Sequence, residues 1–436
     1  MPRPIEELRR VRLEKLENLK KAGINPFPNK FERKLSLKES RVSKLGSEIK
    51  TAGRITALRT HGALTFADLW DAEAKIQLLF KKDELSDEDY KNIESLDIGD
   101  FLGVVGELFK TNAGELTILV QKYTFLSKAL RPLPEKWEGL KEKETRFRNR
   151  YLDLIANEQS RKTLTARSKI VSTTRRFLDE LGFLEVETPV LQPVYGGAAA
   201  KPFTTHYEAL EHDFYLRIAD ELYLKRLIIG GFEKVYEIGK DFRNEGIDST
   251  HSPEFTQMEC YQAYGDLYDM ISLVEGLYKR MAKEIYAKTE ITYQGKILDF
   301  GKSWERLPHA KAPKDEKGDI DGSKIWNPTF VVDWPLKTTV FAKVNRDNPM
   351  LVERFEPFAG GMELGNAYTE LNDPLLQRRL LEEQKNPVDE DFLEAMEYGM
   401  PPMGGLGLGI DRLAMIFTDQ SNIREVIAFP TLKPRQ

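Results

Sequence analysis

The spacing of apolar residues changes along the first third of the chain. Within residues 5–22, apolar side chains recur near helical spacing among charged ones, which predicts one amphipathic helix that Gly23 and Pro26 end. From 49 to 126 the apolar residues instead come in short runs broken by glycine and asparagine. We therefore expect roughly five strands, with a helical interruption at 84–95, that form a small antiparallel barrel.

The rest of the chain mixes strand and helix patterns. Helical spacing recurs near 159–181, 266–288 and 374–399, and short alternating runs such as FLEVETPVL lie between these stretches. Because strands and helices do not alternate regularly, the pattern predicts an α+β domain on an antiparallel sheet. We expect an N-terminal helix with a basic lead-in at 1–48, a barrel at 49–130, a charged linker at 131–155 and the α+β domain at 156–436.

Composition narrows the class of protein. Of the 436 residues, 41% are hydrophobic and 31% charged, which is typical of a globular protein with a large core. No apolar run reaches about 18 residues and the N-terminus lacks an apolar signal segment, so we expect a cytoplasmic protein without a membrane partner. The single cysteine, Cys260, excludes an intrachain disulfide and a metal site built from cysteines.

Basic residues gather at the start of the chain. Residues 1–50 hold 14 Lys and Arg against 7 Asp and Glu, although the whole chain has a net charge of −5. Such an excess can mean a polyanionic partner, but taken alone it favours a solvated helix of mixed charge.

The stretch 242–261, FRNEGIDSTHSPEFTQMECY, carries the most chemistry. Arg243 and Glu245 are two apart, and so are Glu259 and Tyr261, so on strands each pair would share a face. The polar residues between them indicate a turn. Such a hairpin could offer a cation to a phosphate and carboxylates to an ammonium group, which predicts a site that joins ATP to a basic amino acid.

The chain has no P-loop, so ATP would need another binding device. The glycine-rich stretch 404–409 followed by Arg412 could bring backbone and a guanidinium group close to phosphates. The same glycines could instead let a strand pack tightly on a helix.

Further carboxylates lie on a second strand pattern. Asn366, Tyr368 and Glu370 are spaced by two and can share one strand face. Glu363 is an odd step away, so it would need a bulge near Gly365 to join them. Glu356 and Glu363 could hold Mg²⁺ or could be solvated acids.

Taken together, these motifs resemble those of class II aminoacyl-tRNA synthetases, and specifically bacterial-type class II lysyl-tRNA synthetases. Three family motifs occur in order: the long helix with FLEVETPV, then FRNEG with HSPEFTQME, then GLGLGIDRLAMIF. RYLDL, GGAAAKPF, RIADELYLKRL and ELNDP match as well, so the resemblance covers nearly the whole chain. It implies an all-β OB-fold barrel that binds the anticodon, followed by a class II antiparallel catalytic sheet with helices.

The resemblance implies roles for matching positions. Arg243 and Arg412 would be catalytic, with Arg243 on the α-phosphate and the amino acid carboxylate and Arg412 near the γ-phosphate. ATP would also be bound by Glu245, His251, Glu356 and, stacking on adenine, Phe255, and Glu356 and Glu363 would hold Mg²⁺. Lysine would be bound by Gly197, Glu221, Arg243, Glu259, Tyr261, Asn366, Tyr368 and Glu370, and the anticodon by Phe66, Gln77 and, more loosely, Arg59. For Phe66, a place in the barrel core is as good an interpretation of the sequence as a contact with the anticodon.

The implied reaction is ATP-dependent activation of L-lysine to lysyl-adenylate and transfer to the 3′ end of tRNA(Lys), in a homodimer that pairs through the first motif. Two carboxylates and a phenol satisfy the three donors of an ammonium group. A neutral side chain would leave those carboxylates unpaired, a penalty that can give about 10⁴–10⁵ discrimination.

Three departures from the family pattern stand out. Ser252 replaces a common Asn, Ala63 replaces a common Lys, and the insertion near 301–327 is shortened and predicted to be a loop. The alternatives are an aspartyl- or asparaginyl-tRNA synthetase, a non-catalytic tRNA-binding paralogue, and a ligase that puts lysine on a protein or lipid. The first is disfavoured by Glu259 and Glu370, which do not suit an acidic side chain. The second is disfavoured because the phosphate-binding arginines Arg243 and Arg412 are present. The third is disfavoured because the N-terminal barrel is complete.

Overall fold

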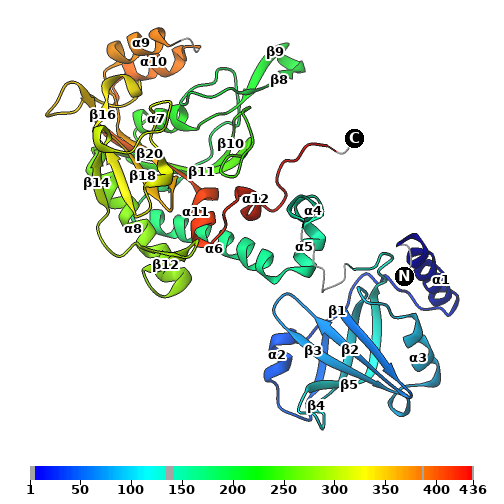
Figure 1. Ribbon diagram of the computed structural model, residues 1–436. Coiled ribbons are helices and arrows are strands. Elements are labelled where there is room, and N and C mark those ends of the chain that lie inside the picture. Colours follow the sequence, from blue (N-terminus) through cyan, green and yellow to red (C-terminus); the bar gives the residue numbers. More distant parts are fainter. Residues whose placement is uncertain (1–4, 134–141, 385–386, 435–436) are drawn as a thin grey trace. The chain divides into compact units, whose positions relative to one another are not determined.

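The computed structural model describes residues 5–133, 142–384 and 387–434, which form two compact units at Met1–Gly139 and Leu140–Gln436 (Figure 1). In the described residues, no helix has the length and apolar character needed to cross a membrane.

The first unit is a closed five-stranded barrel with the strand order β1-β2-β3-β5-β4. Its strands are β1 (Glu48–His61), β2 (Leu64–Trp70), β3 (Lys75–Lys81), β4 (Phe101–Lys110) and β5 (Leu116–Ser127), and its helices are α1 (Ile5–Lys21), α2 (Leu37–Val42), η1 (Lys82–Glu84), α3 (Asp87–Asn92) and η2 (Ile93–Ser95). The predicted barrel is confirmed, but it is not wholly antiparallel, because β3 pairs with β5 in parallel.

Part of the basic excess of residues 1–50 is used inside this unit. Arg12 is buried and donates hydrogen bonds to the carbonyl oxygens of Ile98, Ala129 and Arg131 at 2.9–3.1 Å. Lys15 pairs with Asp97 at 2.9 Å. These two cations hold α1 in place, so a polyanion would have to rely on other basic residues.

The second unit is built on a nine-stranded sheet with the order β14-β15-β18-β20-β21-β11-β10-β6 and with β19 beside β18. Its strands are β6 (Leu184–Glu185), β10 (Lys234–Phe242), β11 (Glu254–Ala263), β14 (Glu305–Pro308), β15 (Thr329–Val332), β18 (Arg354–Ala359), β19 (Met362–Glu363), β20 (Gly365–Thr369) and β21 (Met403–Gly409). The central pairs are antiparallel and only the edge pairs, β14 with β15 and β6 with β10, are parallel. This arrangement agrees with the predicted fold class.

Helices α6 (Glu158–Glu180), α8 (Leu267–Tyr286) and α11 (Ile410–Phe417) form the main core with one face of this sheet. Alternate β11 residues such as Met258 and Cys260 belong to that core. Because side chains alternate along a strand, Glu259 and Tyr261 lie on the opposite face, away from these helices. The sheet thus separates an apolar core from the face that carries the candidate chemistry.

Smaller elements surround the sheet. The remaining helices are α4 (Lys143–Arg148), α5 (Arg150–Ala156), η3 (Glu208–Leu210), α7 (Glu221–Ile229), η4 (His309–Lys311), η5 (Gly322–Lys324), η6 (Leu336–Thr338), α9 (Pro374–Glu383), α10 (Glu390–Glu397) and α12 (Ile423–Val426). The remaining strands are β7 (Leu191–Gln192), β8 (Phe203–Tyr207), β9 (His212–Leu216), β12 (Glu290–Tyr293), β13 (Lys296–Asp299), β16 (Trp334–Pro335) and β17 (Leu351–Val352).

Some elements differ from the sequence predictions. The expected helix at 374–399 is two helices, since Pro387 lacks the N–H and clashes with a continuing helix. The segment 301–327 is not only a loop: it contributes β14 and the buried Trp304, whose ring stacks on Phe330 at 4.9 Å. The predicted linker at 131–155 falls partly outside the described residues, and its later part forms α4 and α5.

A buried ion pair joins three elements next to the candidate site. Arg167 of α6 donates to Asp411 Oδ1 at 2.7 Å and to Thr256 Oγ1 at 2.9 Å. Asp411 Oδ2 also accepts from the Thr256 N–H at 2.7 Å. Asp411 lies in the first turn of α11 and directly precedes Arg412. This cluster therefore fixes the position of Arg412 at the start of the helix.

Asp411→Ala should lower the free energy of unfolding of the second unit by about 3 kcal/mol, because it leaves a partly buried guanidinium without its charged partner and the Thr256 N–H without an acceptor. Urea denaturation followed by near-ultraviolet circular dichroism measures the change. Asp213→Ala is a matched control that removes an exposed partner of His206, and it should cost less than about 1 kcal/mol. Equal losses in the two variants would contradict the buried-pair argument.

Candidate functional site

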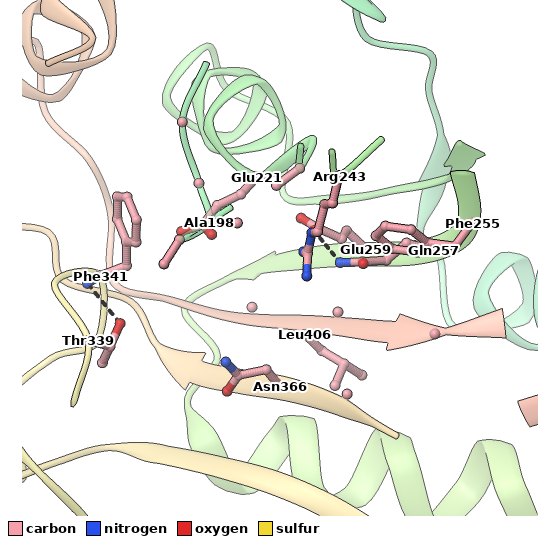
Figure 2. Close-up of a pocket in the computed structure, with 18 of the residues that line it drawn as sticks. Ala198, Glu221, Arg243, Phe255, Gln257, Glu259, Thr339, Phe341, Asn366 and Leu406 are labelled. Carbon is pink, nitrogen blue, oxygen red and sulfur yellow. Dashed lines mark hydrogen bonds between the residues drawn. The ribbon is translucent and has the colours of Figure 1, made fainter. Parts of the chain in front are cut away.

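A cavity of about 450 Å³ lies on the face of the sheet that carries Glu259 and Tyr261 (Figure 2). This volume is within the range of small-molecule sites. In Figure 2, Glu221 and Arg243 enter the cavity from one side and Asn366 enters from the other. Its lining includes Glu363, predicted for Mg²⁺, and nearly all the residues predicted for ATP and lysine, namely Gly197, Glu221, Arg243, Glu245, His251, Phe255, Glu259, Tyr261, Asn366, Tyr368, Glu370 and Arg412.

Glycines of β21 make room for side chains of the neighbouring strands. Gly405 lies opposite Tyr261 in the strand register, and a Cβ added there would lie 2.1 Å from Glu370 Oε1 and 2.5 Å from Tyr261 Cε1. The adjacent Gly404 faces α8, where a Cβ would lie 2.9 Å from the Asp266 carbonyl oxygen. The glycine-rich stretch therefore both opens the cavity and packs on a helix.

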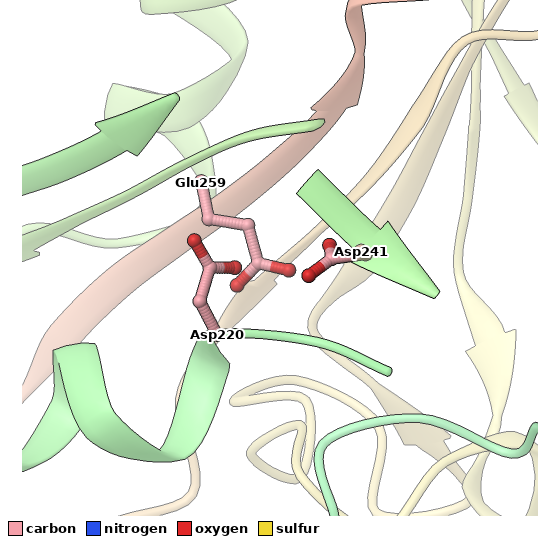
Figure 3. A group of neighbouring side chains, drawn as sticks. All are labelled: Asp220, Asp241 and Glu259. Carbon is pink, nitrogen blue, oxygen red and sulfur yellow. The ribbon is translucent and has the colours of Figure 1, made fainter. Parts of the chain in front are cut away.

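The acidic end of the cavity is more crowded than the sequence indicated. Asp220, Asp241 and Glu259 are buried, and their carboxylates point toward one another with ligand oxygens within 4.8 Å (Figure 3). Burial, and then the charges of Asp220 and Asp241, raise the pKa of Glu259 well above its usual range. Burial also raises the pKa of Asp241, to about 6, although Arg217 opposes this with a contact of 3.2 Å.

Glu259 is held by its neighbours on the same strand. Tyr261 donates its hydroxyl hydrogen to Glu259 Oε2 at 3.1 Å, and Gln257 donates to Oε1 at 2.6 Å. On β20, Asn366 donates to the Tyr368 hydroxyl at 2.6 Å. The structure therefore places side chains spaced by two on one face, as predicted for both strands.

Lys225 is a buried cation that the sequence reasoning missed. Its Nζ lies 2.5 Å from Glu221 Oε1 and 2.6 Å from Glu370 Oε2. The spacing of four between Glu221 and Lys225 on a helix was a signal, but that spacing is common in exposed surface pairs. Only the fold shows that Glu370 completes the cluster.

Arg243 and Glu245 do not lie on a strand, because β10 ends at Phe242. The prediction that they share a strand face is therefore wrong, although both line the cavity. The Arg243 guanidinium lies over the Phe255 ring, 5.0 Å from its centroid, and its Nε donates to the Ile218 carbonyl oxygen at 3.3 Å.

Arg412 connects strand β19 to the loop that carries His251. Its Nη1 donates to the Glu363 carbonyl oxygen at 2.7 Å, and its Nη2 lies 3.0 Å from His251 Nε2. Although burial opposes it, hydrogen bonds from Thr250 and His251 lower the pKa of Asp248 to about 2. An ionised Asp248, 2.8 Å from His251 Nδ1, holds the proton on Nδ1 and leaves Nε2 to accept from Arg412.

Glu356 and Glu363 both line a second hollow beside the cavity, together with Arg354. Burial and the Glu363 charge raise the pKa of Glu356 to about 8, and Arg354 opposes the shift. Two carboxylates that repel each other in this way and line one hollow are a donor set suited to Mg²⁺. The predicted pair therefore fits a hard divalent cation.

The three residues predicted to read the anticodon lie in the barrel. Phe66 is half-buried and is absent from the barrel core among the described residues, so the alternative core placement does not hold. It pairs across the strands with Arg59, which contacts Asp68 at 3.1 Å. Gln77 lies opposite Asp68 on β3. All three gather on one outer face of the barrel.

Comparison with known proteins shows matches along nearly the whole chain. A family model described as tRNA synthetases class II (D, K and N) matches residues 142–433, and one described as an OB-fold nucleic acid binding domain matches residues 49–126. Similar proteins include the lysine–tRNA ligases of Carboxydothermus hydrogenoformans and Roseiflexus castenholzii, at 46% and 47% identity. Each alignment covers 99% of this chain, and 99% and 100% of the respective relative.

Proposed function

This chain belongs to the class II tRNA synthetases, among the lysine–tRNA ligases, and we propose that its cavity activates L-lysine with ATP and passes the lysyl group to tRNA(Lys). The observation that carries the proposal is the charge of the cavity lining: one cavity is lined by the buried carboxylates of Glu221, Glu259 and Glu370 and by the guanidinium groups of Arg243 and Arg412. A substrate with ammonium groups and a second substrate with a triphosphate would each meet side chains of opposite charge in this cavity.

The acidic end recognises the amino acid. Glu259, Tyr261 and Glu370 receive the side-chain ammonium, with Asn366 and Tyr368 beside them. A hydrogen bond to a charged group contributes about 1.5–3 kcal/mol, and a neutral side chain would leave the carboxylates unpaired. An aspartate or asparagine substrate would place an acidic or neutral group against these carboxylates, which disfavours those two specificities.

Gly197 and Glu221 hold the α-amino group. Gly197 has a φ of 81°, and a Cβ there would lie 3.1 Å from Glu221 Cβ, so a side chain at this position would be strained and would press on the carboxylate. The backbone therefore approaches the substrate closely at this point.

Arg243 and Arg412 carry the ATP end. Arg243 contacts the α-phosphate and the lysine carboxylate, Arg412 approaches the γ-phosphate with Glu245 and His251 nearby, and Phe255 offers an aromatic face to adenine. The lysine carboxylate is ionised at pH 7 and needs no general base. It attacks the α-phosphorus, pyrophosphate leaves and lysyl-adenylate forms. A 3′ hydroxyl of tRNA then loses its proton and attacks the lysyl carbonyl carbon, and AMP leaves. Arg243 offsets the charge that develops at the α-phosphate, and positioning supplies much of the rest.

Glu356 and Glu363 would hold Mg²⁺ beside the phosphates. When bound, the ion offsets phosphate charge. It would also relieve the repulsion that raises the pKa of Glu356. Activation that proceeds undiminished in a strong chelator would contradict this assignment.

The barrel binds the anticodon through Arg59, Phe66 and Gln77, because a partly exposed aromatic ring beside a cation suits single-stranded RNA. Phe66→Ala should weaken tRNA charging and leave amino acid activation unchanged. Loss of both activities would point to a structural role instead.

We also propose a homodimer and a cytoplasmic location, where tRNA charging serves protein synthesis. The first motif exposes apolar side chains, and Leu181, Leu184 and Leu191 are each more than 40% exposed. A second copy of this chain that covers these leucines would remove the apolar patch from water. A stable, active monomer in sedimentation would contradict the dimer, and fractionation tests the location.

ATP–pyrophosphate exchange should occur with lysine and with none of the other standard amino acids at comparable rates. The reason is that only lysine satisfies the buried carboxylates with an ammonium group at the correct depth. Exchange driven by aspartate or asparagine would instead indicate an aspartyl- or asparaginyl-tRNA synthetase. Absence of exchange with intact tRNA binding would indicate a non-catalytic paralogue, and exchange without tRNA charging would indicate a ligase for another acceptor.

Gly405→Ala should raise the KM for lysine by about 100-fold or more, because the new methyl group would occupy the space of Glu370 Oε1 and the Tyr261 ring. The KM for ATP should change much less. Gly409→Ala is the matched control, since a Cβ there meets its nearest atom at 3.9 Å, and the KM for lysine should stay within about two-fold. An unchanged KM for lysine in Gly405→Ala would contradict the pocket assignment.

A further inference from the structure

Lys225 lies beneath the acidic end of the cavity and is fully buried. It does not itself line the cavity, but Glu221 and Glu370, its two ion-pair partners, do. The Phe341 and Tyr261 rings lie around its Nζ, with centroids 4.8 and 5.8 Å away. The chain thus places its own ammonium group between the two carboxylates that the proposed function assigns to the two ammonium groups of the substrate.

Each carboxylate keeps one oxygen for another partner. Lys225 contacts Glu221 Oε1 and Glu370 Oε2. The other oxygen of Glu370, Oε1, is buried and has no hydrogen-bond partner among the described residues. It faces Gly405, while Glu221 Oε2 lies near Gly197. An unpaired buried carboxylate oxygen is costly, so a donor from a ligand is expected there.

Lys225 also fixes the distance between the two carboxylates. Because Glu221 Oε1 and Glu370 Oε2 lie 2.5 and 2.6 Å from the same nitrogen, they are no more than about 5.1 Å apart. Two buried carboxylates without this cation would repel each other and take up protons.

We propose that Lys225 is a positioning residue for lysine recognition, which favours the ionised forms of Glu221 and Glu370 and keeps the two carboxylates at a fixed separation, so that the cavity measures the distance between the two ammonium groups of the substrate. The inference rests on the proposed function. It adds a residue that touches neither lysine nor ATP and acts only through Glu221 and Glu370.

The groups around the cluster determine the expected pH dependence. Glu221 faces Lys225 from its own helix, Glu370 and Tyr368 approach from the end of β20, and Glu259 and Tyr261 approach from β11. Burial raises the pKa of Glu370 to about 8, and Lys225 opposes that shift. Removing Lys225 should therefore raise the pKa of Glu370 further and leave less of the ionised form at neutral pH.

The test uses Lys225→Met, which keeps an unbranched side chain of nearly the same length and removes the charge. At pH 7 the KM for lysine in ATP–pyrophosphate exchange should rise by about 10-fold or more, with the KM for ATP within about two-fold. The rise should be largest at low pH and should shrink toward pH 9, because the pH profile moves to the alkaline side. Lys279→Met, which removes an exposed lysine of α8, should change neither KM nor profile.

An unchanged KM for lysine in Lys225→Met, or a rise that is equal at every pH, would overturn the proposal, since a packing defect alone does not move a pH profile. Lys225→Arg gives a second test if the methionine variant does not fold. It keeps the charge, so the profile should keep its midpoint, but the wider guanidinium should reduce discrimination between lysine and ornithine. Unaltered discrimination would overturn the fixed separation. Failure of the unmodified enzyme to exchange with lysine would instead refute the proposed function.

Discussion

The cost of burying like charges is the constraint on which this site depends. Around one end of the cavity the fold buries Asp220, Glu221, Asp241, Glu259 and Glu370. The buried cations that contact them among the described residues are Arg217 and Lys225. A buried carboxylate without a cation is neutralised by a proton or destabilises the fold. The excess of carboxylates therefore gives the site a strong preference for a ligand that brings positive charge, and the preference follows from the protein's own electrostatics.

The sheet makes this concentration of charge possible. Glu259 and Glu370 are more than a hundred residues apart, yet β11, β21 and β20 are adjacent strands, and the intervening strand has glycine at 405 and 407. Because these two positions of the middle strand have no side chain, carboxylates from both neighbours can lean over it. The alternate residues on the other face form an apolar core with three helices, so the polar face rests on a rigid base.

The parts of this arrangement that could be predicted from the sequence follow from local periodicity. A spacing of two correctly placed Glu259 with Tyr261, and helical spacing located α6 and α8 within a few residues. Lys225 could not be recognised, because a helical Glu–Lys pair at a spacing of four has the same appearance at the surface. Asp220 and Asp241 could not be assigned either, since their crowding around Glu259 depends on strand pairing. Edge strand β14 escaped prediction because its few apolar residues gain burial only beside β15.

The departure at Ser252 can be judged from the contacts that hold its loop. Asp248 Oδ1 accepts hydrogen bonds from the N–H groups of Thr250 and His251 at 2.7 and 2.8 Å, and the Ser249 carbonyl oxygen accepts from Ile423 N at 2.7 Å. The side chain of Ser252 is not a partner in any of these contacts. The loop is therefore positioned by residues on either side of the unusual one, and the exchange at 252 leaves intact the frame that presents His251 to Arg412.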